Sequence, residues 1–176
     1  SVALPLREPA RYARLGVPPP RGVLLHGPPG SGKTSLARQL ASVARANFVE
    51  VQAPQLVSSV VGESESRLAA LFAAARSAAP CILFIDQLEA LAPPRGGDTS
   101  SEGTMDRLLS LLLIELDGVQ ATSGPPVVLL GVCLRLSQLD PAILRPGRLD
   151  VHVPVSPPNA AERQLLLRRM LSASPV

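Results

Sequence analysis

Short apolar runs alternate along the chain with longer segments whose apolar side chains recur at helical spacing. The apolar runs predict strands at residues 22–26, 47–52, 81–86, 127–133 and 150–155. The longer segments predict helices at residues 33–44, 63–78, 105–116, 139–145 and from Asn159 onward. Strands and helices in strict alternation form one parallel sheet with helices packed on its faces. The pattern therefore predicts an α/β fold with a doubly wound parallel sheet.

Turn residues and caps predict where some of these elements begin and end. Residues 1–21 form a proline-rich lead-in segment before the first strand. The pair Asp117-Gly118 is expected to end the helix that precedes the fourth strand. Asn159 and Glu162 have the spacing of a capping box, which predicts that the last helix begins there.

Composition limits the class of protein. Hydrophobic residues make up 46% of the 176 residues and aromatic residues only 2%, which predicts a single domain with an aliphatic core. The richest apolar run, residues 108–116, is broken by Ser110 and Glu115, so no membrane span is expected. There is no signal-peptide pattern at Ser1.

Charge and cysteine usage do not point to nucleic-acid or metal binding. The net charge of +3 comes from arginines scattered along the chain, so nucleic-acid binding is not expected. Cys81 and Cys133 fall in predicted buried strands without metal-ligand spacing nearby. Reduced core cysteines are typical of an intracellular protein, so an intracellular location is predicted.

One loop carries the most specific chemistry. Residues 27–34 fit the phosphate-binding pattern G-x-x-x-x-G-K-[ST] at every fixed position, between a predicted strand and a predicted helix. Lys33 is the single lysine among seventeen basic residues, and its compact ammonium suits a crowded phosphate site. It is expected to contact the β- and γ-phosphates, and the Thr34 hydroxyl is expected to hold Mg²⁺. The predicted nucleotide contacts are Gly27, Pro28, Pro29, Gly30, Ser31, Gly32, Lys33, Thr34 and Ser35.

An acidic residue is predicted to lie beside this loop. Asp86 ends the apolar run at residues 81–86, which is typical of a buried parallel strand. Ligand sites in open α/β sheets lie at the carboxyl ends of the strands. Asp86 is therefore predicted to help hold Mg²⁺ through water, together with Thr34.

Four stretches together resemble the AAA family of ATPases over nearly the whole chain. They are the phosphate loop, residues 81–87, Glu-Leu-Asp-Gly at 115–118, and the segment 139–150 that contains Arg-Pro-Gly-Arg. The likeness is closest to the group of valosin-containing protein, its nuclear relative and the peroxisomal peroxins. It implies an AAA+ P-loop NTPase subdomain at residues 22–176, with the strands in the order 5-1-4-3-2 and with ATP and Mg²⁺ bound. The family's C-terminal helical lid is expected to lie outside this chain.

The resemblance also implies roles for two arginines. Arg145 and Arg148 are expected to be arginine fingers, which reach a neighbouring subunit's nucleotide and stabilise charge on the transferring phosphoryl group. Such fingers imply a homo- or hetero-hexameric ring of AAA subunits that acts on a polypeptide substrate or an adaptor protein. The predicted catalytic residues are Asp86, Gln87, Arg145 and Arg148.

Three positions depart from the family pattern. Gln87 replaces a glutamate that polarises the attacking water, and Leu134 replaces a sensor asparagine. An amide cannot take the proton of water, and a leucine cannot hydrogen-bond to it. Positioned acid–base groups supply ~10²–10⁴ in rate, so the loss of one raises the barrier by roughly 3–5 kcal/mol. Val60 stands where the family has an aromatic residue that grips polypeptide in the pore.

Two functions remain open on this evidence. The first is an ATP-binding AAA domain that hydrolyses ATP poorly and donates arginine fingers to a neighbour. The alternative is a fully active unfoldase motor domain in which Gln87 is an engineered substitution that traps ATP. The first is favoured because Gln87 and Leu134 are independent losses around the same water molecule, and Leu134 has no rationale as an engineered change.

Overall fold

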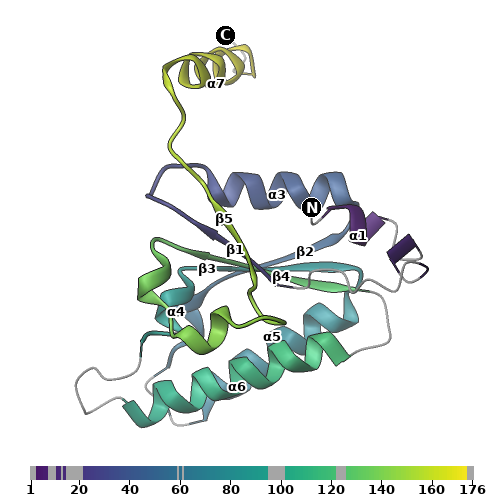
Figure 1. Cartoon of the computed structure of the whole chain (residues 1–176), viewed down its shortest axis with the longest axis vertical. Coiled ribbons are helices and arrows are strands. Elements are labelled where there is room, and N and C mark those ends of the chain that lie inside the picture. The colour runs from purple at the N-terminus through teal and green to yellow at the C-terminus, as the bar shows by residue number, and fades with distance from the viewer. Residues whose placement is uncertain are drawn as a thin grey trace.

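A single parallel sheet forms the centre of the protein. The structure, a computed structural model, describes residues 3–7, 11–12, 14, 22–58, 60, 62–94, 102–121 and 126–173. Its strands are β1 (Gly22–His26), β2 (Asn47–Gln52), β3 (Cys81–Asp86), β4 (Val127–Cys133) and β5 (Val151–Pro154). They lie in the order β2-β3-β4-β1-β5, and all neighbouring strands are parallel. The predicted fold class and strand order are confirmed (Figure 1).

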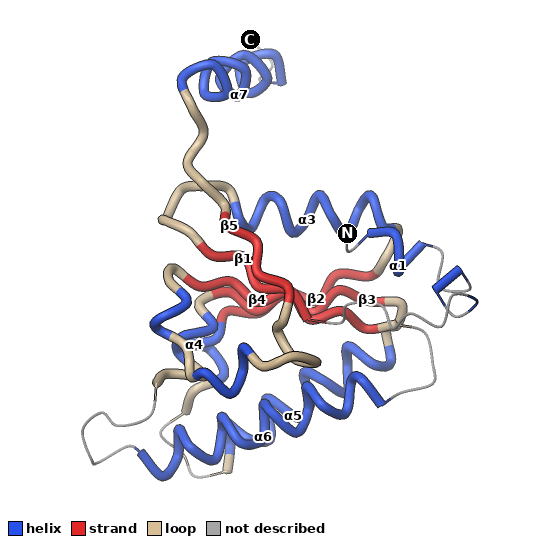
Figure 2. Tube along the Cα trace, in the orientation of Figure 1, coloured by secondary structure: helices blue, strands red, loops and turns tan. Residues whose placement is uncertain are grey.

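Helices cover both faces of this sheet. The longer ones are α3 (Lys33–Ala44), α5 (Glu63–Ser77) and α6 (Glu102–Ala121), and the last long helix, α7 (Ala160–Ala173), lies apart from the sheet. The shorter ones are α1 (Ala3–Arg7), α4 (Ala53–Leu56), and the 3₁₀ turns η1 (Leu88–Ala90), η2 (Leu136–Gln138) and η3 (Pro141–Leu144). Figure 2 shows α3 on one side of the sheet and α5 and α6 on the other.

The core has two halves because successive strand side chains point to opposite faces. Val23 and Leu25 of β1 join the buried cluster that contains Ala37 of α3. Leu24, between them, joins the cluster that contains Phe72 of α5. Burial on both faces explains why the inner strands are continuous apolar runs in the sequence.

The helix before β4 is longer than the sequence predicted. We expected residues 105–116, whereas α6 spans Glu102–Ala121, and the prediction that Asp117-Gly118 ends it is wrong. The Asp117 carboxylate accepts hydrogen bonds from Arg148, so it does not terminate its own helix. A glycine inside a helix costs only about 1 kcal/mol relative to alanine. The helix therefore passes through Gly118.

Other boundaries differ by a few residues. The helix predicted at 139–145 is the 3₁₀ turn η3, capped by Asp140, whose carboxylate accepts a hydrogen bond from the Ala142 amide at 2.8 Å. The strand predicted at 150–155 is the shorter β5, because Asp150 belongs to the preceding turn, where it accepts from the Gly147 amide. Most of the lead-in segment lies outside the described residues, but within it α1 buries Leu6 against the α3 side of the core.

The last helix begins where the sequence predicted. The Asn159 amide donates to Glu162 at 2.8 Å and the Glu162 amide donates to Asn159 at 3.0 Å, which confirms the capping box. The helix α7 extends away from the sheet (Figure 1). Its exposed large apolar side chains are Leu165, Leu166, Leu167, Met170 and Leu171. Within the described ranges, no helix combines the length and the apolar character needed to cross a membrane.

Two glycines provide a test of this packing. A β-carbon on Gly22 would lie 1.8 Å from the Arg148 carbonyl oxygen, so Gly22→Ala must displace the backbone that precedes β5. We expect it to lower the free energy of unfolding by ~1–3 kcal/mol, as overpacking does. The matched control is Gly118→Ala, whose β-carbon meets no atom within 4 Å and which should be neutral or stabilise by up to ~1 kcal/mol. Denaturant unfolding measures both, and equal stability of the two variants would contradict the packing described.

Candidate nucleotide-binding site

The carboxyl ends of β1, β3 and β4 meet at one edge of the sheet and border a cleft of about 490 Å³. The phosphate loop follows β1, while the segments after β3 and β4 form the opposite wall. The lining residues are Pro29, Gly30, Gly32, Lys33, Thr34, Ser35, Asp86, Gln87, Glu89, Val132, Cys133 and Leu134. Of the predicted nucleotide contacts, Gly27, Pro28 and Ser31 lie in the loop but do not line the cleft. The fold thus brings most of the predicted site residues together.

Backbone conformation opens the loop towards the cleft. Gly30 and Gly32 have φ values of 75° and 88°, a backbone region that residues other than glycine rarely adopt. Gly32 is also the N-cap of α3, so no side chain caps the helix, and its first turn carries no acidic residue. The first N–H groups of α3 and the positive end of its dipole therefore remain available to an anion.

Lys33 is a buried cation. The residue is only 8% exposed, and its ammonium donates hydrogen bonds to the carbonyl oxygens of Gly27 and Pro28 at 2.8 Å each. The Ser31 hydroxyl lies 3.5 Å away. Among the described residues, no carboxylate lies within ion-pair distance of this ammonium. The carbonyls satisfy its hydrogen bonds but do not neutralise its charge, so the site favours an incoming anion.

The side chains of Thr34 and Asp86 lie beside each other in the cleft lining. The Thr34 hydroxyl lies 3.4 Å from Asp86 Oδ2, while Asp86 Oδ1 accepts a hydrogen bond from the Gln87 amide at 2.9 Å. The described residues contain no cluster of three or more acidic, histidine or cysteine side chains suited to a metal. Mg²⁺ commonly binds one or two protein oxygens, with substrate phosphates and water completing its shell. Thr34 and Asp86 fit that mode, and the ion would neutralise phosphate charge.

Gln87 and Leu134 both depart from the family pattern, and neither brings a proton acceptor into the cleft. Gln87 follows β3 in the left-handed region, with φ 55°, and its side chain is exposed at the wall. Leu134 follows β4 and is 42% exposed, with an apolar side chain at the cleft wall. These two positions offer an amide and a hydrocarbon where water would have to be held.

Sequence reasoning missed three residues of the cleft, Glu89, Val132 and Cys133. Glu89, on η1, lines the wall three residues after Asp86, and its Oε2 atom is buried without a hydrogen-bond partner among the described residues. Cys133 ends β4 beside it. Burial, with the negative charge of Glu89 as a second cause, raises the pKa of the Cys133 thiol to about 11, while Lys33 acts in the opposite direction. The signal for Glu89 was its position one turn beyond the strand acid.

The two predicted fingers differ in their surroundings. Arg148 forms a bidentate ion pair with Asp117, with both N–O distances 2.9 Å, and donates to the Ala142 carbonyl at 2.8 Å. The hydrogen bonds from Arg148 lower the pKa of Asp117. The Arg145 side chain is exposed, and its guanidinium has no hydrogen bond or ion pair within the part of the chain that the structure describes. Neither arginine lines the cleft of its own chain.

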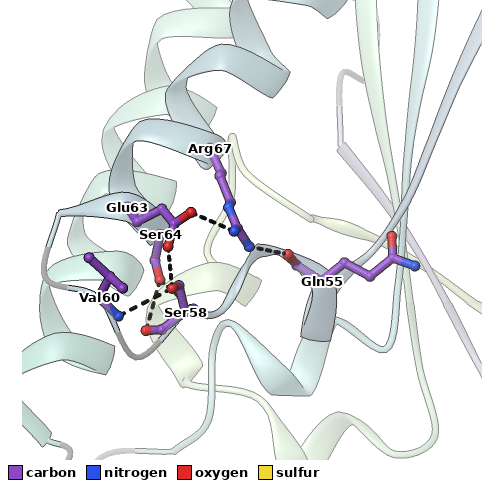
Figure 3. Close-up of polar contacts among 6 residues, drawn as sticks. All are labelled: Gln55, Ser58, Val60, Glu63, Ser64 and Arg67. Carbon is purple, nitrogen blue, oxygen red and sulfur yellow. Dashed lines mark hydrogen bonds and ion pairs between the residues drawn. The ribbon is translucent and has the colours of Figure 1, made fainter.

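A polar network braces the base of the connection that carries Val60 (Figure 3). The buried Ser64 hydroxyl accepts from the Ser58 amide at 2.7 Å, and the Ser58 hydroxyl donates to Glu63. Arg67 in turn donates to Glu63 and to the Gln55 carbonyl. The hydrogen bonds from Ser58 and then Arg67 lower the pKa of Glu63. Val60 itself is 60% exposed, so its apolar side chain is accessible on a connection whose base is held by these hydrogen bonds.

Comparison with known proteins agrees with this geometry. Residues 23–157 match the ATPase family associated with various cellular activities (AAA). A cell division cycle protein 48 homolog from Archaeoglobus fulgidus is 42% identical across all 176 residues of the chain. The chain spans 24% of that relative's length. With its phosphate loop, strand order and sequence all in agreement, this chain belongs to the AAA family of ATPases.

Proposed function

We propose that this domain binds Mg-ATP but hydrolyses it slowly, and that it supports ATPase activity in a neighbouring AAA subunit. The observation that carries the proposal is the buried ammonium of Lys33, which has no carboxylate to neutralise it among the described residues. A triphosphate supplies the missing negative charge. The open first turn of α3 and the Thr34–Asp86 pair supply contacts for phosphate and for Mg²⁺.

Slow hydrolysis follows from what surrounds the attacking water. Gln87 can donate or accept a hydrogen bond but cannot take a proton at neutral pH, and Leu134 can do neither. Loss of a positioned acid–base group removes ~10²–10⁴ in rate. The groups that bind phosphate and Mg²⁺ are therefore retained, while positions 87 and 134 lack the side chains that would activate and hold water.

We further propose that the full-length protein is a ring-forming ATPase that remodels polypeptides. The likeness to the cell division cycle protein 48 homolog supports membership of a ring of AAA subunits. The exposed side chain of Val60, above the network of Ser58, Glu63 and Ser64, suits contact with an extended apolar polypeptide. In such a ring Arg145 and Arg148 would act on the neighbour's nucleotide.

The alternative function is a fully active motor domain in which Gln87 replaces a natural glutamate. It accounts for Gln87 but leaves Leu134 unexplained, because a leucine in the cleft wall does not trap ATP. The two alternatives differ in whether restoring Glu at position 87 alone gives full turnover.

ATP binding should depend on Lys33. Lys33→Ala removes the buried cation, so we expect the affinity for a fluorescent ATP analogue to fall by ~30–150-fold, as the loss of a charged hydrogen-bonding partner worth about 2–3 kcal/mol predicts. Arg38→Ala is the control, because Arg38 lies on the same helix and pairs with Glu50 outside the cleft. Equal affinity of Lys33→Ala and the parent protein would refute the phosphate-loop assignment.

The hydrolysis rate should rise in two steps as the family's residues are restored at positions 87 and 134. Gln87→Glu supplies a proton acceptor but leaves the water poorly held, so we expect partial turnover, and Gln87→Glu with Leu134→Asn should exceed it by about tenfold or more. Steady-state phosphate release by the full-length protein, with any other ATPase domain inactivated, is the measurement. If Gln87→Glu alone reached the rate of the double variant, the active-motor alternative would be favoured.

The two arginines should differ in a mixed ring. Arg145→Ala in this subunit alone should lower the neighbour's turnover by up to the ~10³–10⁵ known for arginine fingers, without changing the thermal stability of this domain. Arg148→Ala should lower both, because it also breaks the Asp117 ion pair. Asp117→Asn is the control that frees Arg148 while keeping its charge. If both arginine variants left turnover unchanged in intact rings, the finger assignment would be wrong.

A further inference from the structure

We propose that Glu89 is the proton acceptor for the slow hydrolysis that this domain retains. The proposal rests on the proposed function, because it concerns water that attacks ATP bound in the same cleft. It assigns to Glu89 a catalytic role that the residue at position 87 can no longer perform.

The first argument is the unusual state of the Glu89 carboxylate. The residue lines the cleft, yet its Oε2 atom is buried and accepts no hydrogen bond from any described residue. A buried carboxylate oxygen without a donor costs free energy, so such atoms are rare outside sites that receive a ligand, a water molecule or an ion. Glu89 therefore lines the nucleotide cleft and has one buried carboxylate oxygen that no described donor satisfies.

The second argument is the rigidity of the turn that carries Glu89. On either side of it, Leu88 and Leu91 are fully buried in the core on the α5–α6 side of the sheet. The amides of Leu91 and Ala92 both donate to the Leu88 carbonyl, at 3.0 and 3.1 Å. The Ala92 carbonyl in turn accepts from the Asp140 amide at 2.9 Å. Anchors on both sides fix the backbone of Glu89 and so restrict where its carboxylate can reach.

The third argument is the charge pattern around Glu89. Glu89, Lys33 and Cys133 all line the same cleft. The negative charge of Glu89 raises the pKa of the Cys133 thiol, and the positive charge of Lys33 lowers it. Lys33 is the group expected at the γ-phosphate. A carboxylate that lines the same cleft as that cation, beyond ion-pair distance and on the wall formed by β3 and β4, is suited to water on the attacking side of the phosphate.

The proposed step is balanced with water and ATP alone. As the water oxygen forms a bond to the γ-phosphorus, one water proton passes to a carboxylate oxygen of Glu89. The bond between the γ-phosphorus and the bridging oxygen breaks, and its electron pair leaves with ADP. The products are ADP and inorganic phosphate, and Glu89 then returns its proton to solvent. Because Glu89 lies two positions beyond Gln87 and Leu134 gives the water no hydrogen bond, the step is slow.

The test is single-turnover hydrolysis of γ-labelled ATP by the full-length protein, with any other ATPase domain inactivated at its phosphate-loop lysine. Bound nucleotide is measured on the same sample. We expect slow hydrolysis in the parent protein and a fall of about 100-fold in Glu89→Gln, at the lower end of the ~10²–10⁴ supplied by a positioned base. ATP occupancy should stay the same, which also shows that the variant is folded.

Glu65→Gln is the matched control. Glu65 has the same kind of buried carboxylate oxygen without a hydrogen bond, but it lies on α5 and its nearest cation is Arg107 at 3.9 Å. Its substitution should leave hydrolysis unchanged. In the double variant Glu89→Gln with Gln87→Glu, a carboxylate returns to the cleft and hydrolysis should recover at least tenfold over Glu89→Gln.

Each other outcome has a defined meaning. If ATP is bound but Glu89→Gln hydrolyses it as fast as the parent, or if the parent does not hydrolyse it at all, the role of Glu89 is refuted and ATP binding stands. An equal fall in Glu65→Gln also refutes it, because the effect would then be structural. If the parent binds no ATP, the proposed function itself fails.

Discussion

A buried positive charge without an opposite charge beside it is the constraint around which this domain is organised. Lys33 is held by two loop carbonyls at 2.8 Å, and these fix its position without neutralising it. The loop can hold a cation there because its backbone is locked between β1 and α3 by glycines with positive φ. A site of this kind is complete only when an anion enters, so the fold itself creates the requirement for phosphate.

Strand order explains why the other groups are within reach. Because β4 lies next to β1 and β3 lies next to β4 in a parallel sheet, Asp86 and Leu134 emerge at the same edge as the phosphate loop, although they are far from it in sequence. Two of the three departures from the family pattern, Gln87 and Leu134, fall on the β3 and β4 wall, whereas the loop wall keeps the pattern. In the proposed function, the loop wall binds phosphate, while the β3 and β4 wall supplies Asp86 for Mg²⁺ and borders the attacking water. Changes at Gln87 and Leu134 can then slow hydrolysis without removing phosphate binding.

The sequence predicted the fold well where local patterns are strong. The apolar runs marked β1 to β4 at their observed ends, and the capping pattern at Asn159 placed the start of α7. It failed where distant contacts decide. The end of α6 was misjudged because Asp117 binds Arg148, 31 residues away, and no local signal reveals that pair. Glu89 was missed although it lies one turn beyond the strand acid, because its importance depends on which strands lie beside it.

The central claim is that ATP binding has been kept while water activation has been weakened. The most direct test is to load the full-length protein with Mg-ATP, with any other ATPase domain inactivated, and to identify the nucleotide that remains bound over several minutes. The account predicts that most of the bound nucleotide is still ATP, with slow conversion to ADP. Bound ADP alone at the earliest times, or no bound nucleotide at any concentration, would contradict it.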